Sequence, residues 1–440
     1  MPRRPKKHSA LPPARRAALY ALTSCLAGAD IQAALDTALG PKQGLEPLSG
    51  RDTALATELA YGTLRLKLRL DWLLGRFLKR PEDLPIPMRM SLALAAYEII
   101  QLDKVPSYAS VDWCVEHVKT TINPGLAKVA NAVLRKLTDL GEATADPEFY
   151  RRETPDERAF LTTFYAAPRW LTDLWCESYG LQRAEHYLAA SAQAAPLGLR
   201  LRADAPKAQG LLEQWTASGN CLASGADGVA LTRPPEDLHE LLDAGAVLRQ
   251  SMAGQEALHA LGCSGWPRPL WDACCGRGGK TLLLADAGGG PILASDTSLG
   301  RLRGLKHELE RLTISGVVAA RARADRPAPL KGCVPAILVD APCSGLGVLS
   351  RRPDTKIKRR PEDLIKLAAL QDNILDHAAL ALAPGGLLAY VTCTLNPAEN
   401  EQRVERFLNH HKGFSLDIQW QTPSDSPLNE FFYAALLKRS

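Results

Sequence analysis

Apolar residues recur at spacings of three, four and seven over residues 55–77, which predicts a helix with one hydrophobic face. Three basic residues lie elsewhere around this helix: Arg65, Lys67 and Arg69. Prolines then interrupt the pattern, at positions 81, 85 and 87, before a second apolar helix over 88–102. Ser107 is placed to cap a helix that runs to Lys119, and 129–137 closes the series. We therefore predict an all-helical domain over residues 1–145.

The segment 146–250 has a weaker pattern. Its polar beginning contains two prolines, and a short amphipathic helix is predicted over 170–179. The apolar run 197–201 is typical of a strand, and 206–218 of a helix. We interpret this region as linker helices followed by a small α+β subdomain.

From residue 251 onward, short apolar runs alternate with helical stretches, the pattern of a mostly parallel α/β sheet. The predicted strands are 269–273, 291–295, 317–324, 336–339 and 387–392. The run Pro384–Gly386 is expected to end the last helix before its strand, and two terminal runs, 414–420 and 431–437, to add a pair at the sheet edge. The fold class predicted for 251–440 is a Rossmann-like, doubly wound domain with seven strands.

Composition limits the environment. Hydrophobic residues make up 46% and charged residues 23% of the chain, as in ordinary globular proteins. No apolar run reaches the roughly 18 residues of a membrane helix, and the start lacks a secretory signal, so we expect a cytoplasmic protein without a membrane partner. The ten cysteines follow no metal-ligand spacing. We expect reduced thiols and no metal.

Positive charge is concentrated in two places. The formal net charge is only +5, but the first twenty residues carry six basic side chains and no acidic one. The run 351–360 carries six more, with Asp354 as its one acid. Either cluster alone is more typical of a solvated face, yet both permit nucleic-acid binding.

Each predicted parallel strand is followed or ended by a chemically useful side chain. In strand order these are Asp272, Asp296, Asp325, Asp340 and Cys393. Ligands of doubly wound sheets bind beyond the carboxyl ends of the strands. Single polar residues there often cap the next helix, but five in succession indicate a ligand site.

The loop between the first strand and its helix is rich in glycine, which allows close backbone approach to a ligand. A Walker A loop would need glycine at Cys274, and a dinucleotide fingerprint would need glycine at Thr281. Both fail, which argues against a nucleoside triphosphatase or an NAD enzyme. The loop suits a carboxylate and an amino group, and Asp296 suits ribose hydroxyls, so S-adenosylmethionine fits better.

Two cysteines follow neighbouring strands. Cys343 comes after the fourth strand and Cys393 after the fifth. C5 of cytosine attacks a methyl group only after a thiolate has added to C6, and loss of the C5 proton then releases the thiolate. Methylation at C5 would therefore be served by three groups: a nucleophilic thiol, a second thiol for release, and Asp340 at N3 or the exocyclic amine. The run 351–360 would then lie beside the cleft, facing RNA phosphates.

Three runs in this domain resemble the signatures of bacterial RNA cytosine-C5 methyltransferases. They are Asp272–Thr281, Asp340–Gly347 followed by Arg351–Asp354, and Tyr390–Thr394 followed by Pro397, Glu399 and Asn400. Related DNA enzymes use the Pro-Cys cysteine for attack and lack the Thr-Cys one. The resemblance implies that Cys393 attacks the base and that Cys343 assists release.

The same resemblance implies the cofactor site. It assigns S-adenosylmethionine to the backbone of one loop and to carboxylates at three strand ends, with Asp325 near the adenine. These residues are Cys274, Cys275, Gly276, Arg277, Gly278, Gly279, Lys280, Asp296, Asp325 and Asp340. The family usually has Ala-Ala-Pro where this chain has Cys275-Gly276-Arg277, so this loop lacks a stiffening proline and gains a charge.

The helical region narrows the resemblance. Runs 59–65, 106–111 and 131–135 are similar to the NusB-like domain of the RsmB (Sun/Fmu) subfamily. Members of that subfamily methylate a cytosine in small-subunit ribosomal RNA, which implies an RNA partner for a chain that we expect to be monomeric. Two alternatives remain: a methyltransferase acting on another RNA, such as transfer RNA, and a non-catalytic RNA-binding factor. The intact Cys343 and Cys393 count against the second.

Overall fold

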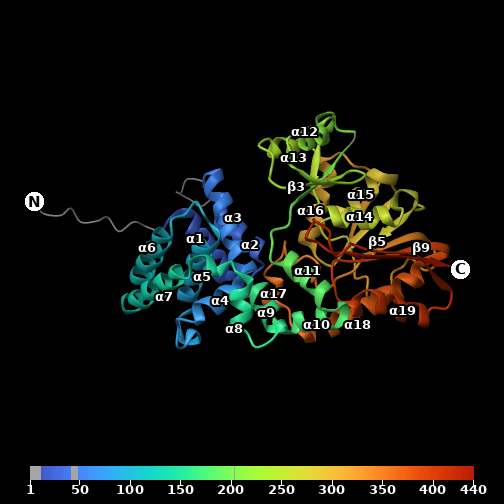
Figure 1. The fold of residues 1–440 in the computed structure, drawn as a ribbon. Coiled ribbons are helices and arrows are strands. Elements are labelled where there is room, and N and C mark those ends of the chain that lie inside the picture. Colours follow the sequence, from blue (N-terminus) through green and yellow to red (C-terminus); the bar gives the residue numbers. More distant parts are fainter. Residues whose placement is uncertain (1–10, 41–47, 203) are drawn as a thin grey trace, which may run out of the picture. The chain divides into compact units, whose positions relative to one another are not determined.

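The computed structural model describes residues 11–40, 48–202 and 204–440 (Figure 1). The chain forms two compact units. The first comprises residues 1–177, 191–193 and 352–358, and the second comprises the remaining residues. No helix of the described residues is long and apolar enough to cross a membrane.

The first unit is helical, as predicted. Its α-helices are α1 (Pro13–Leu26), α2 (Ile31–Leu39), α3 (Gly50–Arg65), α4 (Lys67–Gly75), α5 (Ile86–Gln101), α6 (Ser107–His117), α7 (Ala127–Asp139), α8 (Pro147–Glu153), α9 (Glu157–Phe164), most of α10 (Arg169–Tyr179) and α17 (Thr355–Lys358). Helix α5 is buried nearly all round and packs against α1, α3, α4, α6 and α7. It is therefore the central helix of this unit.

Two side chains of α5 explain why its neighbours pack so closely. The Tyr97 ring lies against Gly62 of α3, where an added Cβ would collide with the ring. The fully buried Glu98 carboxylate accepts hydrogen bonds from Arg15 Nε at 2.7 Å, Ser110 Oγ at 2.6 Å and Trp113 Nε1 at 2.8 Å. A buried carboxylate is tolerated only with such partners, so Glu98 ties α1 and α6 to α5.

Three details of the predicted helices were wrong. The apolar stripe over 55–77 spans two helices, because the chain breaks at Leu66, which caps both α3 and α4. Ser107 is the first residue of α6 and caps nothing; the N-cap is Pro106. The predicted helix over 206–218 is a 3₁₀ turn at Pro206–Ala208 followed by α12 (Leu211–Ala217).

The basic residues of 55–77 are buried, not on a solvated face. Arg65, Lys67 and Arg69 are each less than 9% exposed. Arg69 donates to the Tyr150 hydroxyl at 2.9 Å, and its guanidinium lies over the rings of Tyr150 and Phe164. Arg69 therefore holds α4 against α8 and α9.

The second unit contains the predicted seven-stranded sheet, in the order β10-β11-β9-β8-β5-β6-β7. The strands are β5 (Leu270–Asp272), β6 (Ile292–Asp296), β7 (Val317–Arg321), β8 (Val334–Asp340), β9 (Leu382–Thr392), β10 (Phe414–Gln421) and β11 (Tyr433–Arg439). The pairings among β5 to β9 are parallel, and β11 pairs antiparallel with both β9 and β10. The first strand, β5, is therefore an interior strand of the sheet, between β8 and β6.

Helices cover both faces of this sheet. They are α14 (Met252–Ala260), α15 (Gly279–Gly288), α16 (Leu299–Arg311), α18 (Pro361–Ala381) and α19 (Glu401–His410). Alternate residues of β8 enter different cores: Ala336 and Leu338 pack with α14 and α15, whereas Ile337 and Val339 pack with α18 and α19. This alternation is why the strands are apolar on both sides.

Two strand boundaries differ from the predictions. Pro384–Gly386 does not end a helix, because α18 ends at Ala381 and these residues lie inside β9. The pairing of β9 with β8 shifts register around them, between Leu382 and Leu387, and Gly385 has φ +72°. Strand β7 ends at Arg321, so Asp325 lies four residues beyond the strand and does not end it.

A small antiparallel sheet precedes the large one, with the order β2-β3-β1-β4. Its strands are β1 (Leu197–Leu201), β2 (Cys221–Ser224), β3 (Gly228–Leu231) and β4 (Val247–Arg249), and it packs against α12 and α13 (Leu238–Asp243). The fully buried Arg200 on β1 donates to Asp286 Oδ2 of α15 at 2.6 Å. This ion pair fastens the small sheet to the large one; α11 (Leu181–Ser191) lies just before it in the chain.

Candidate active site at the strand ends

The parallel pairing of β8 with β9 brings the two predicted cysteines together. Asp340 is opposite Val391 in the register, so the loops that follow both strands begin at the same edge. Cys343 Sγ lies 3.4 Å from Cys393 Sγ, and the Cys393 N–H donates to Cys343 Sγ at 3.4 Å. Both thiols are half-buried. The two sulfurs can therefore reach the same atom of a bound molecule.

The two thiols are held in different environments. The hydrogen bond to Cys393 and burial raise the pKa of Cys343 well above its ordinary value. Cys343 therefore keeps its proton at neutral pH and can donate it to Cys393 Sγ. A protonated thiol is a poor nucleophile, because the thiolate is the reactive form.

A lysine and a carboxylate lie beside the cysteines. Lys280 Nζ, in the first turn of α15, is 2.7 Å from Asp340 Oδ2 at the end of β8. Burial alone would lower the pKa of Lys280, but attraction to Asp340 and Cys393 outweighs burial and raises it.

The two cysteine loops are tied together by a buried carboxylate. Glu399 is fully buried and accepts from the Ser344 N–H at 2.8 Å, from Gln371 Nε2 at 2.9 Å and from Asn396 Nδ2 at 3.0 Å. Gln371 Nε2 also donates to Pro342 O at 3.0 Å. Both cysteine loops are thus fixed through one side chain.

Further bonds fix the second cysteine loop. Asn400 Nδ2 donates to Thr394 O at 2.9 Å, and its Oδ1 accepts from Thr392 Oγ1 at 2.5 Å. The hydroxyls of Ser344 and Thr394 lie 2.6 Å apart. Glu399 and Asn400 were identified only as part of a signature; Gln371, Ser344 and Thr394 were missed as site residues, because nothing in the sequence around them shows that they pair.

The glycine loop between β5 and α15 has a backbone conformation that favours glycine. Gly276 and Gly278 have φ of +57° and +89°, and a Cβ on Gly278 would collide with Leu305. Helix α15 begins at Gly279 without a side-chain cap. Uncapped N–H groups at a helix start suit an anionic group.

Burial raises the pKa of both cysteines of this loop. Burial, with nearby carboxylates, raises the pKa of Cys274 well above its ordinary value. Burial also raises the pKa of Cys275, which is only 6% exposed and whose N–H donates to Ser295 O at 2.9 Å. Neither thiol ionises at neutral pH, so they serve through their backbone and packing.

Asp296 ends β6 next to this loop. Its Oδ2 accepts from the Gly276 N–H at 3.1 Å, and its Oδ1 from the Ser298 N–H at 2.7 Å. Asp325 is different: it forms a two-pronged pair with Arg323, at 3.0 and 2.6 Å, which lowers its pKa. The structure joins Asp296 to the loop and gives Asp325 no bond to it.

Asp272 is fully buried at the end of β5. Thr281 Oγ1 donates to its Oδ2 at 2.6 Å, while Oδ1 has no partner among the described residues. Burial, reinforced by Asp340, raises the pKa of Asp272 to about 7. The carboxyl group is therefore a structural link between β5 and α15.

The basic run 351–360 is not the free cationic surface that we predicted. Arg351 pairs with Glu430, Lys358 with Asp354, and Arg359 donates to Ser344 O. Lys356 is only 3% exposed, and only Arg352 and Arg360 are exposed to solvent. In the amino-terminal basic cluster, residues 1–10 lie outside the described residues. Arg15 of that cluster donates a hydrogen bond to the Glu98 carboxylate.

The described residues contain no group of three or more His, Cys, Asp or Glu that could hold a metal ion. Among solved structures, this chain is similar to a methyltransferase homologue from Pyrococcus horikoshii (21% identical, TM-score 0.56), covering 65% of this chain and all of that one. It is also similar to NSun6 from Pyrococcus horikoshii with SFG (18% identical, TM-score 0.53), covering 62% and 98%. The fold is therefore that of a Rossmann-like methyltransferase.

Sequence comparison identifies the family. Residues 267–434 match the 16S rRNA methyltransferase RsmB/F family, and residues 12–139 match the NusB family. Curated relatives are named ribosomal RNA small subunit methyltransferase B, with "probable" before the name in the first two. They are from Bacillus subtilis (30% identical, 84% of this chain and 83% of that one), Synechocystis (31%, 88% and 88%) and Salmonella arizonae (30%, 92% and 94%). The chain belongs to the RsmB/F family of methyltransferases, with an amino-terminal NusB domain.

Proposed function

We propose that this chain methylates C5 of a cytosine in small-subunit ribosomal RNA, with S-adenosylmethionine as the methyl donor and Cys393 as the nucleophile. The observation that carries the proposal is the 3.4 Å separation of Cys343 and Cys393 beside the Lys280–Asp340 pair. The ribosomal target is supported by the names of the relatives and by the NusB domain.

The arrangement supports different roles for the thiols of Cys393 and Cys343. We assign the addition to C6 of the base to Cys393, which interacts electrostatically with the Lys280 ammonium. Cys343 keeps its proton, so it does not compete for the attack. After methyl transfer, the C5 proton must pass to a base before the Cys393–C6 bond breaks and Cys393 leaves as a thiolate. Cys343 can be that base once it has lost its own proton to solvent.

The base also needs a group that polarises its ring. We assign Asp340, at the end of β8, to contact N3 or the exocyclic amine of cytosine. Lys280 holds its carboxylate at 2.7 Å. Addition of a thiolate to C6 puts negative charge on the ring, so a proton or a cation near N3 lowers the barrier.

The residues of the glycine loop fit the cofactor. Uncapped N–H groups at the start of α15 would receive its carboxylate, and Asp296 its ribose hydroxyls. The loop comprises Cys274, Cys275, Gly276, Arg277, Gly278, Gly279 and Lys280, and we also assign Asp325 and Asp340 to the cofactor cleft. S-adenosylmethionine, when bound there, supplies an electrophilic methyl group on sulfur.

The test uses a Cys343→Ala variant with unmodified small-subunit ribosomal RNA and S-adenosylmethionine. Without the release step, protein joined to RNA should accumulate and migrate slowly on a denaturing gel. Cys343→Ala/Cys393→Ala is the matched control and should give no such band. Cys393→Ala alone should abolish transfer while retaining the cofactor.

The outcomes separate the alternatives. A band that persists in the double variant would show that another residue attacks the base. A band with transfer RNA and none with ribosomal RNA would move the proposal to the other substrate. Cofactor binding without any adduct or transfer would favour a non-catalytic RNA-binding role.

A further inference from the structure

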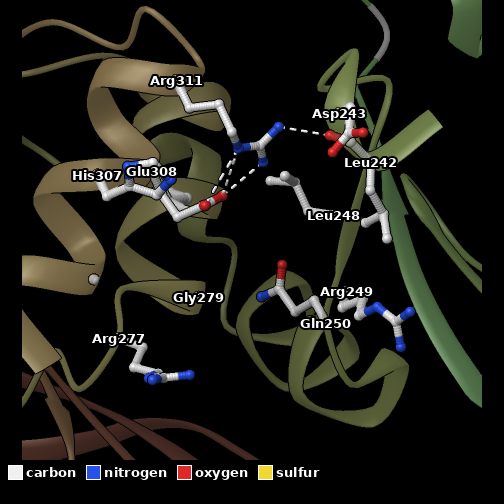
Figure 2. A pocket seen from close by; sticks show the side chains of 12 residues that line it. Leu242, Asp243, Leu248, Arg249, Gln250, Arg277, Gly279, His307, Glu308 and Arg311 are labelled. Atoms are coloured by element: carbon white, nitrogen blue, oxygen red, sulfur yellow. Dashed lines mark hydrogen bonds and ion pairs between the residues drawn. The ribbon is translucent and has the colours of Figure 1, made fainter. Parts of the chain in front are cut away.

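A second cavity lies next to the cofactor loop, within the unit that holds both sheets. It has a volume of about 630 Å³, within the range of small-ligand pockets. Its walls come from the glycine loop and the start of α15, from one side of α16, and from the α13–β4 segment of the small subdomain (Figure 2). Arg311 of α16 donates to Leu242 O at 2.6 Å, which fixes two of these walls together.

This cavity is distinct from the site at the strand ends. None of Asp272, Asp296, Asp340, Cys343 and Cys393 lines it. It shares with the cofactor loop only Arg277 and Gly279. A group bound here would therefore touch the loop without occupying the cysteine site.

Two arginines give one end of the cavity an unbalanced positive charge. The exposed side chains of Arg277 and Arg249 form no hydrogen bond or ion pair with any described residue. At the other end, Arg311 is neutralised by Glu308 at 2.6 Å, and Asp243 is a further acid. In Figure 2 the Arg277 guanidinium extends toward the middle of the view, below Gln250, whereas the Arg249 guanidinium extends to the opposite side of Gln250, away from Arg277.

A neutral donor lies between the arginines. The side-chain oxygen of Gln250 accepts from Arg200 Nε at 3.0 Å, which fixes the orientation of the amide. Its Nε2 is left without a partner among the described residues and, in Figure 2, lies on the side of the amide toward Arg277. Guanidinium and amide N–H groups are the donors that proteins use for RNA phosphate oxygens.

The remaining wall is apolar. Leu242, Leu248 and Leu282 also line the cavity. A cavity with donors at one end and aliphatic side chains along its wall suits a phosphate joined to a flat base.

We propose that this cavity binds one nucleotide of the substrate RNA outside the target cytosine, with its phosphate at Arg277 and Gln250 and its base against the leucines. The proposal rests on the proposed RNA methylation, because it assigns the cavity to that substrate. Binding here would hold the RNA against the same loop that carries the cofactor.

The test compares Arg277→Ala and Arg249→Ala with Arg233→Ala, a matched control on an exposed arginine that does not line the cavity. RNA affinity is measured at several salt concentrations, and S-adenosylmethionine affinity by calorimetry. Arg277→Ala should weaken RNA binding about tenfold, as expected for loss of a charged hydrogen bond. It should also reduce the slope of log K against log salt by about 0.7, and Arg277→Lys should recover most of the affinity.

Each outcome decides a different point. If the unaltered protein transfers no methyl group to any RNA, the proposed function fails first. If it is active but Arg277→Ala and Arg249→Ala bind RNA as Arg233→Ala does, the nucleotide site alone is wrong. If Arg277→Ala weakens S-adenosylmethionine and leaves RNA affinity unchanged, the cavity belongs to the cofactor. If inorganic phosphate or a free mononucleotide binds the cavity as tightly as RNA does, the cavity is an anion site without a role in RNA binding.

Discussion

The Glu399 carboxylate accepts a hydrogen bond from the Ser344 N–H at 2.8 Å, so a side chain beyond one cysteine fixes the backbone beside the other. The same oxygen accepts from Gln371 Nε2, which also holds Pro342 O. The separation of the two sulfurs is therefore set by a carboxylate that touches neither of them. Glu399 is a positioning residue.

Glu399→Gln should impair this arrangement although it preserves the shape of the side chain. The carboxylate receives three donors, and an amide would present one donor in place of an acceptor. A flip of Asn396 does not rescue the bond, because its Oδ1 already accepts from the Ala398 N–H. One buried donor is left unpaired, at a cost of about 1–3 kcal/mol.

The measurement is single-turnover methyl transfer together with cofactor affinity. We expect Glu399→Gln to lower the rate at least about tenfold and to leave S-adenosylmethionine affinity nearly unchanged. Glu405→Gln, on the exposed side of α19, is the control. An unaltered rate in Glu399→Gln would show that the link does not set the sulfur positions.

The sequence predicted the sheet well for a physical reason. Strands buried on both faces are continuous apolar runs, and they are visible without any knowledge of their neighbours. The beginning of β9 was missed because Pro384–Gly386 are turn residues that here form a bulge opposite Val334 and Ala336. The break at Leu66 was missed because both α3 and α4 bury leucines at helical spacing.

The site was predictable only in part. Asp340 and Cys393 follow adjacent strands, so pattern and topology together place them at one edge. The partners of Glu399 come from three separate segments, and no local pattern links them. The burial of Lys356 was not predicted, because a lysine in a basic run looks solvated until its carbonyl partners are known.

Gly347→Ala should disturb the second cysteine directly. An added Cβ would collide with Phe431 O and lie 3.0 Å from Cys393 O, and both are backbone atoms that cannot rotate away. Gly347 also pairs with both residues, donating to Cys393 O at 3.0 Å and accepting from the Phe431 N–H at 2.8 Å. We expect a loss of about 1–3 kcal/mol in stability, as for other overpacked sites, and a fall in transfer rate.

A thermal melt and a rate measurement check this prediction. Gly265→Ala is the matched control, because an added Cβ there meets nothing within 4 Å. Equal melting temperatures and equal rates for the two variants would mean that the chain around Gly347 moves without consequence for Cys393.

Lys280 and Asp340 should act as one unit. Lys280 Nζ lies 2.7 Å from Asp340 Oδ2, and each charge compensates the other for the loss of water on partial burial. We expect Lys280→Met and Asp340→Asn each to lower the transfer rate about a hundredfold, the scale of a lost polarising group. The double variant should lose little more than the more damaged single variant, as in a coupled pair.

The measurement is a double-mutant cycle on single-turnover rates at saturating S-adenosylmethionine. Saturation matters because both residues are also assigned to the cofactor cleft. If the losses of the two single variants multiply in the double variant, the two side chains contribute independently. That result would contradict the prediction that they act as a coupled pair.

Lys356 should make the stability of the helical unit depend on pH. The residue is only 3% exposed, and its ammonium donates two long hydrogen bonds, to Arg65 O at 3.5 Å and to Tyr165 O at 3.4 Å. Burial and the nearby Arg65 lower the pKa of Lys356 from 10.5 to about 7. Between these two values the unfolded chain holds the proton and the folded chain does not. Stability should therefore rise with pH across this window, by at most about 1.4 kcal/mol per pH unit.

The measurement is the unfolding midpoint at pH 6.5 and pH 9 for the unaltered protein, Lys356→Met and Lys128→Met. Other groups also titrate in this range, so the difference between variants is the quantity that counts. Lys356→Met should lose the rise with pH and gain stability most at pH 6.5, where the buried charge costs most. Lys128 is exposed on α7, and its replacement should leave the pH dependence unchanged. Parallel pH curves for Lys356→Met and the unaltered protein would mean that the buried amine keeps its proton in the folded chain.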